Sequence, residues 1–200
     1  MTRSIGFVAA CAAALAAAPA AAQYRTQEPQ APGYAAPNLR LPPLDARGDF
    51  VTPNRDLTGH VAFWNVKIAL NVAAIGCRHP GSLRLIADYN DIIARHGNLI
   101  RAAEGTVIAR TGVAVRDRMS TKLFNYFAQP PAQKQFCPVA GSVAERMRGM
   151  SAAEAIEAAP ALLSELDRPF TDFYRAYAQY QADLAEWRGG QTVQLASAKP

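Results

Sequence analysis

Between about residue 56 and residue 188, hydrophobic residues recur at intervals of three and four positions. This is the period of an amphipathic α-helix, in which such residues share one face. In the stretch that follows Ser82, the opposite face carries acidic and basic residues in alternation, as a solvated helix surface does. No segment of useful length alternates apolar and polar residues like a half-buried strand. The pattern predicts an all-α fold, a bundle of five or six helices over residues 56–188.

Capping residues and helix breakers divide the first half of this region. A first helix is expected to run from a cap at Asp56 to about Arg78, and it has few positions that are not apolar. A second, single helix is expected from a cap at Ser82 through Val107. Gly112 then opens a third helix.

Prolines and capping boxes divide the second half. Pro131 suits the first position of a fourth helix, where a backbone N–H is not needed. The sequences Ser142-x-x-Glu145 and Ser151-x-x-Glu154 match the capping box and predict two further helix starts. A proline inside a helix removes a hydrogen bond and clashes with the preceding turn. The expected breaks or kinks are at Pro138, Pro160 and Pro169.

The segments on either side of this region have no hydrophobic period. Residues 23–55 contain six prolines and two glycines, and such a segment buries too little apolar surface to offset the entropy lost on ordering. We expect a Pro-rich extended linker that docks locally through Leu39, Leu41 or Phe50. Residues 189–200 are expected to form a flexible tail.

The first 22 residues follow the three-part pattern of a secretory signal peptide. Arg3 precedes an apolar run from Ile5 to Ala18, and small residues precede Gln23. This run is shorter than the roughly 20 residues that span a bilayer, so a retained transmembrane anchor is disfavoured. We expect cleavage near Ala22 and a mature protein, without a transmembrane segment, that is periplasmic or secreted.

The segment Val8-Ala-Ala-Cys11 offers an alternative, a lipoprotein in which Cys11 is acylated. Only residues 5–10 would then form the apolar part of the leader, which is shorter than the usual 7–15 residues. Cleavage near Ala22 is therefore favoured over lipidation.

Two cysteines remain in the mature chain, Cys77 and Cys137. An even pair in an exported protein is typical of a structural disulfide. The alternatives are two separate buried thiols or a redox pair, but no Cys-x-x-Cys motif supports the latter. We therefore predict a Cys77–Cys137 bond.

Composition narrows the class of protein. Half of the residues are hydrophobic, 18% are charged and the net charge is +5, which is typical of a folded, mildly basic chain. No run of five like charges occurs, which argues against a nucleic-acid-binding tail and a polybasic membrane anchor. The Gly-rich phosphate loops, the Gly-x-Ser-x-Gly elbow, His-Glu-x-x-His and Cys-x-x-Cys-His are all missing. We therefore assign no catalytic residue, metal ligand or cofactor.

One polar stripe on the first predicted helix is a candidate ligand site. His60, Trp64, Lys67 and Asn71 stand at i, i+4, i+7 and i+11 on a helix that is otherwise apolar. In a cleft, Lys67 would bind an anionic group and Trp64 would stack on the ligand. The alternative, which we favour, is a solvent-facing stripe whose lysine reaches water.

Two other groups of residues are candidate sites. The aromatic stripe Phe173, Tyr174, Tyr177 and Trp187 could form a groove for a glycan or peptide, but at helical spacing it is more often core. Haem could lie between a histidine and a methionine of facing helices. The pairs would be His60 or His96 with Met119 or Met147, although His96 is expected to be a core residue.

These observations favour a non-enzymatic protein with a binding or accessory role in the cell envelope, whose partner is another envelope protein or a cell-wall component. The first alternative is a hydrolase of envelope or extracellular polymers, which would use His60, Lys67 and a carboxylate from another helix. The second alternative is a haem- or metal-binding bundle.

Overall fold

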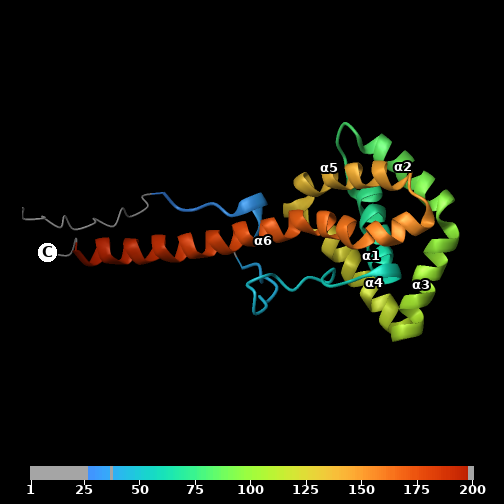
Figure 1. Cartoon of the computed structure of the whole chain (residues 1–200). Helices are drawn as coiled ribbons and strands as arrows, with labels where there is room; N and C mark the ends of the chain where they lie inside the picture. Colours follow the sequence, from blue (N-terminus) through green and yellow to red (C-terminus); the bar gives the residue numbers. More distant parts are fainter. Residues whose placement is uncertain (1–26, 37, 198–200) are drawn as a thin grey trace, which may run out of the picture.

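The fold is an all-helical bundle with one disulfide, as the sequence predicts. A computed structural model describes residues 27–36 and 38–197, which form six α-helices and one short 3₁₀-helix (Figure 1). Within these residues the only β-type pairing is an isolated bridge between Leu44 and Phe50. The expected signal peptide, Cys11 and residues 198–200 lie outside the described residues.

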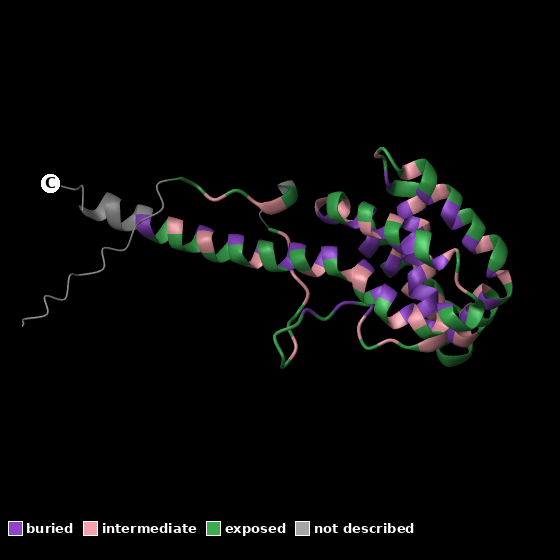
Figure 2. Cartoon of the chain, turned by 45° about the horizontal axis from the view of Figure 1, so that its top comes forward, coloured by how far each residue is buried: buried purple, intermediate pink, exposed green. Residues whose placement is uncertain are grey.

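The helix α1 forms the centre of the bundle and contacts each of the other five helices. Most of its residues are buried, as expected for a helix that is apolar on all sides. Figure 2 shows buried residues concentrated where the helices meet. The elements are η1 (Pro32–Tyr34), α1 (Gly59–Gly76), α2 (Ser82–Arg95), α3 (Gly97–Thr111), α4 (Val113–Phe127), α5 (Pro130–Met147) and α6 (Ala152–Ser197).

The stretch predicted as one helix over residues 82–107 is two helices, α2 and α3, which meet at His96. The backbone of His96 leaves the helical region, with φ −103° and ψ 19°. The amide of His96 still donates to the Ile92 carbonyl, and the His96 carbonyl accepts from the Ile100 amide. Because helical hydrogen bonds continue on both sides, the hydrophobic period does not reveal the break.

The helices α5 and α6 run through their prolines, so of the two effects expected at Pro138, Pro160 and Pro169 a break of the helix is wrong. A proline removes one hydrogen bond from a helix. In α6 the apolar residues Leu163 and Leu166 between the two prolines are buried, and their burial favours continuation of the helix. The helix also continues past Arg188, where the sequence places the end of the helical domain.

Only one of the expected side-chain caps forms. The amide of Ser151 donates to Glu154 Oε2 at 2.7 Å, and the amide of Glu154 donates to Ser151 Oγ at 3.3 Å. The other box, Ser142-x-x-Glu145, lies inside α5. The expected caps at Asp56 and Ser82 are also wrong. The N-cap residue of α1 is Thr58 and that of α2 is Gly81, and neither helix start has a side-chain cap hydrogen bond.

The residues before α1 pack on α6, and we call residues 27–36 and 38–57 the N-terminal arm. Part of α6 projects beyond the bundle with the arm alongside it (Figures 1 and 2). The Tyr177 hydroxyl accepts from the Leu39 amide at 3.0 Å and donates to the Ala36 carbonyl at 2.6 Å. The Phe50 ring packs edge-on against Tyr174, with ring centroids 5.4 Å apart. Leu39 and Leu41 also pack against the core.

The docking of η1 on α5 depends on Gly33. Its φ is +58°, and a Cβ atom would lie 2.9 Å from the Cα, Cβ and carbonyl oxygen of Pro131. Gly33→Ala should therefore detach η1, because both the backbone conformation and the contact oppose a side chain. We expect trypsin to cleave the Gly33 variant at Arg40 faster than it cleaves the unmodified protein. Mass spectrometry of the fragments measures the rate of this cleavage.

The matched control is Gly48→Ala in the same arm. Gly48 also has a positive φ, +82°, but a Cβ atom there would meet nothing within 4 Å. The two variants share the backbone strain and differ in the contact. Equal rates of cleavage at Arg40 in both variants would show that contact with Pro131 does not hold η1.

The predicted disulfide between Cys77 and Cys137 is present, with a Cα–Cα distance of 5.7 Å. Cys77 directly follows α1, whereas Cys137 lies inside α5. Both residues are buried. The bond joins the central helix to a helix that is remote in the sequence.

No helix within residues 27–36 and 38–197 combines the length and the apolar character that crossing a bilayer requires.

Candidate functional site

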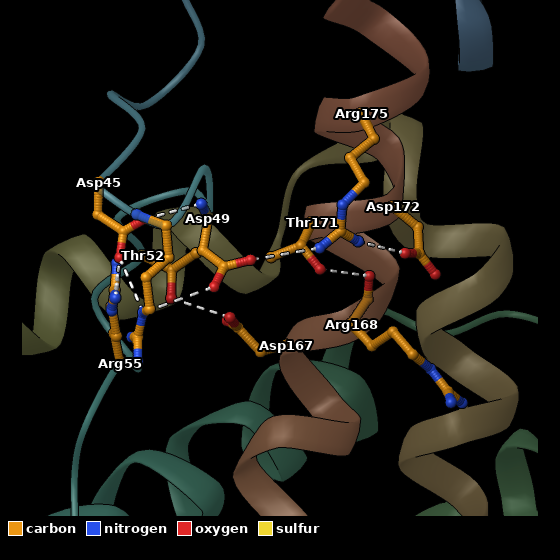
Figure 3. Close-up of polar contacts among 10 residues, drawn as sticks. Asp45, Asp49, Thr52, Arg55, Asp167, Arg168, Thr171, Asp172 and Arg175 are labelled. Atoms are coloured by element: carbon orange, nitrogen blue, oxygen red, sulfur yellow. Dashed lines mark hydrogen bonds and ion pairs between the residues drawn. The ribbon is translucent and has the colours of Figure 1, made fainter.

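A polar cavity of about 560 Å³ lies where the N-terminal arm meets one face of α6. We call it the Asp167 pocket (Figure 3). The arm contributes residues between Arg47 and Leu57, and α6 contributes residues between Pro160 and Arg175. Most of the lining side chains are charged or polar. The pocket therefore differs from the mostly apolar cavities that bind drug-like molecules.

Asp167 holds the arm to α6 through two side-chain hydrogen bonds. Thr52 Oγ1 donates to Asp167 Oδ2 at 2.9 Å, and Asn54 Nδ2 donates to Asp167 Oδ1. Asn65 of α1 then donates to Asn54 Oδ1 at 3.0 Å. Thr52, Asn54 and Asn65 are buried. The result is a continuous polar network from α6 through the arm to the central helix, in which each bond strengthens its neighbours.

Burial raises the pKa of Asp167, and the hydrogen bonds from Asn54 and Thr52, together with the nearby Tyr126 hydroxyl, oppose that rise. Burial, with the charge of Asp167 beside it, also raises the pKa of Tyr126 well above its usual range. Asp167 therefore retains a proton to higher pH than an ordinary aspartate. A carboxyl group with a raised pKa in a cavity is a common feature of functional sites.

The arm side of the pocket is ordered by ion pairs around Asp45. This carboxylate accepts from the Arg55 guanidinium and, at 3.3 Å, from Arg47 Nε. The hydrogen bond from Arg55 is the main reason that the pKa of Asp45 lies well below its usual range. The amides of Arg47 and Asp49 also donate to Asp45 Oδ1, which fixes the turn at the rim.

The α6 side of the rim carries Arg168 and Arg175. Arg175 contacts Asp172 at 2.9 Å and Asp49 at 3.9 Å, so one of its ion pairs crosses from α6 to the arm. Arg168 makes no ion pair with a described residue, and Figure 3 shows its guanidinium directed away from Asp167. The rim thus presents both signs of charge, which suits a ligand that also carries both.

The stripe predicted on α1 does not line the Asp167 pocket. Trp64 is buried, and His60, Lys67 and Asn71 are half-buried. Burial raises the pKa of Tyr89 on α2, and the side chain of Asn71 opposes that rise. In the part of the chain that the structure describes, Lys67 has no ion pair and His60 has no carboxylate partner.

The other candidate site residues lie mostly in the core. Phe173, Tyr174 and Tyr177 are buried, in agreement with the favoured interpretation. His96 and Met147 are also buried. The His96 ring packs edge-on against Phe63, with ring centroids 6.3 Å apart, and burial lowers the pKa of His96.

Sequence reasoning missed Thr52, Asn54 and Asp167. The first two lie in a segment that was expected to be a linker, and Asp167 stands on a helix between Leu166 and Arg168. One signal was present in the sequence: Asp167 directly follows the apolar residue Leu166 and lies one turn before Phe170. A carboxylate at the edge of an apolar face is costly unless it has partners.

Comparison with known proteins adds no relative, because no family model, no curated protein and no solved structure matches this chain.

Proposed function

We propose that this chain is an exported helical-bundle protein with a non-enzymatic binding role in the cell envelope, and that the Asp167 pocket is its ligand site. The observation that carries the proposal is a cavity of about 560 Å³ beside a hydrogen-bonded, partly buried carboxyl group. A volume of this order is typical of small-molecule sites. The rest of the proposal follows from the leader and the disulfide.

Export is supported by two independent features. The first 22 residues match a secretory signal, and Cys77 and Cys137 are joined. Disulfides form and persist in oxidising compartments such as the periplasm and the extracellular space. We therefore propose that the mature protein is periplasmic or secreted.

The ligand that fits the pocket best is a small zwitterion of amino-acid or dipeptide size. Arg175 would bind its anionic group, because surface ion pairs such as those with Asp172 and Asp49 are weak and exchange readily. Asp167 would accept from its ammonium group, since a carboxylate has about four acceptor sites and two hydrogen bonds leave some of them available. This chemistry agrees with a cell-wall peptide as the source.

Binding of the dipeptide alanyl-alanine tests the site. We expect it to raise the Tm of the mature protein at millimolar concentration, and the doubly capped dipeptide to have no effect. Arg175→Gln should weaken the apparent affinity about tenfold or more, because it removes a charge-assisted hydrogen bond. Titration calorimetry measures the change.

The matched control is Arg101→Gln. Arg101 is exposed on α3 and donates to a side chain of its own helix, Asn98, so its loss should not alter dipeptide affinity. Equal affinities for the Arg175 variant and the unmodified protein, or binding of the capped dipeptide, would contradict the assigned site.

The position of the mature N-terminus tests export. The intact mass of protein recovered from the periplasm or the medium should correspond to a chain that begins near Gln23, because small residues precede that position. A diacylglyceryl mass on a chain that begins at Cys11 would instead identify a lipoprotein.

The two alternatives remain predictions without added support. The hydrolase requires a carboxylate within reach of His60, and no described hydrogen bond or ion pair joins the two. The haem alternative requires space between ligands such as His96 and Met147, whereas both are buried in the packed core. The absorption spectrum of natively purified protein would reveal haem directly.

A further inference from the structure

A histidine lies beside the disulfide that joins α1 to α5. The Sγ atoms of Cys77 and Cys137 and one ring nitrogen of His79 all lie within 4.8 Å of one another. His79 stands in the turn between α1 and α2, two residues after Cys77. Two cysteines and a histidine are three of the four ligands that structural zinc sites use.

The ring of His79 has a buried nitrogen with no partner. Its Nε2 atom makes no hydrogen bond with any described residue, although buried polar atoms are nearly always paired. The turn positions this ring, because the His79 carbonyl accepts from the amides of Gly81 and Ser82 at 2.9 and 3.0 Å. Gly81 also leaves room for the ring, since a Cβ atom there would lie 3.3 Å from Cε1.

A cavity of about 390 Å³ adjoins the three side chains. It is lined also by Gln133, Arg78 and Lys134, so it has room for a water or an amide oxygen as a fourth ligand. The two basic residues favour the thiolate form of a nearby cysteine. None of the described residues that line this cavity carries a carboxylate.

We propose that reduction of the disulfide converts this corner into a Cys₂His binding site for Zn²⁺. A dithiol reductant supplies two electrons and two protons: the Cys77–Cys137 S–S bond breaks, two protein thiols form, and the reductant closes to a disulfide. Zn²⁺ then displaces both thiol protons and takes the two thiolates and the His79 nitrogen as ligands. In the oxidised protein the sulfurs are bonded to each other and the site is closed.

The required movement is small. Zinc bound to two thiolates at about 2.3 Å places the sulfurs about 3.8 Å apart in tetrahedral geometry. The sulfurs must separate, and the histidine nitrogen starts within 4.8 Å of both. Because the two Cα atoms are 5.7 Å apart, we expect rotation of the two cysteine side chains to provide this separation. The inference is independent of the Asp167 pocket, which lies on other elements.

The test compares the mature protein in its oxidised and reduced forms. The protein is reduced with dithiothreitol and desalted under anaerobic conditions. It is then titrated with Co²⁺, which serves as a spectroscopic substitute for Zn²⁺. We expect one Co²⁺ per reduced chain with thiolate-to-cobalt charge-transfer absorption, loss of that absorption on adding Zn²⁺, and no such band in the oxidised protein. Circular dichroism in the same samples reports whether the reduced protein remains helical.

Variants separate a built site from two incidental thiols. His79→Ala keeps both cysteines and should weaken Co²⁺ binding about tenfold or more, whereas His60→Ala, which changes a histidine elsewhere on the molecule, should not. Equal affinity in the His79 variant would overturn the proposal. So would the absence of stoichiometric Co²⁺ binding by reduced helical protein, or a reduced chain that is unfolded and does not regain its helices with Zn²⁺.

Discussion

Replacing Cys77 and Cys137 together by alanine should lower the free energy of unfolding by about 2–5 kcal/mol. The bond spans 60 positions of sequence, and in the chain-entropy model closure of such a loop contributes roughly 4 kcal/mol. Both cysteines are buried, and alanine avoids placing a hydroxyl group in the core. The total stability of a domain of this size is typically about 5–15 kcal/mol, so the loss is a large share of it.

Urea unfolding followed by circular dichroism measures this change. The matched comparison is the unmodified protein reduced in the presence of a chelator, which should lose a similar amount because it lacks the same cross-link. Thiol counting on denatured, unreduced protein provides the covalent check. Two free thiols per mature chain, or a loss below about 1 kcal/mol in the double variant, would contradict a stabilising bridge.

A helix could be predicted from the sequence where the pattern of apolar residues along the segment determines which side chains are buried. Residues 61–75 are apolar except at Asn65, Lys67 and Asn71, which predicts a mostly buried helix, and α1 is the central helix of the bundle. The division at His96 was not predictable in this way. Only one residue leaves the helical conformation, and the apolar residues of α2 and α3 continue at the same intervals. Which neighbour each half packs against is a property of the whole fold.

At the prolines the error is the opposite one: breaks were predicted where the helix continues. The prediction relied on the local effect of proline and did not consider the packing of the surrounding side chains. A proline costs a helix about 3 kcal/mol in isolation. The core side of α6 around Pro160 and Pro169 includes Ala159, Leu163 and Leu166, all buried. Fully burying one large aliphatic side chain gains roughly 1.5–3 kcal/mol. Several such side chains therefore outweigh one proline, and the helix continues.

The Asp167 pocket was beyond sequence reasoning because its parts are far apart in the chain. Thr52 is 115 positions from Asp167, and Asn54 is 113 positions from it. No local motif joins such residues. The polar stripe at His60, Trp64, Lys67 and Asn71 was visible because it is local. Its residues share a helix face, yet they do not line this pocket.

Phe170→Ala should lower the free energy of unfolding by about 3–5 kcal/mol, the usual range for removing a buried phenylalanine. Phe170 has 0% of its surface exposed and lies on α6 at the meeting point of three helices. Its ring centroid is 4.7 Å from that of Tyr126, 5.5 Å from Phe127 and 5.2 Å from Phe136. The substitution removes three aromatic contacts and leaves a cavity that neighbouring rings, themselves packed together, fill only in part.

The control for this prediction is Leu83→Ala on α2, where the side chain is 82% exposed. That variant should change the free energy of unfolding by no more than about 0.5 kcal/mol, since surface substitutions away from special features rarely do more. Urea unfolding of both variants, with the disulfide intact, separates loss of packing from loss of the cross-link. The disulfide constrains the unfolded chain, whereas Phe170 stabilises the folded core. The Phe170 variant should therefore unfold at a lower urea concentration than the unmodified protein, although both retain the disulfide. A loss of less than about 1 kcal/mol in the free energy of unfolding of the Phe170 variant would mean that the Phe170 ring does not pack in this core.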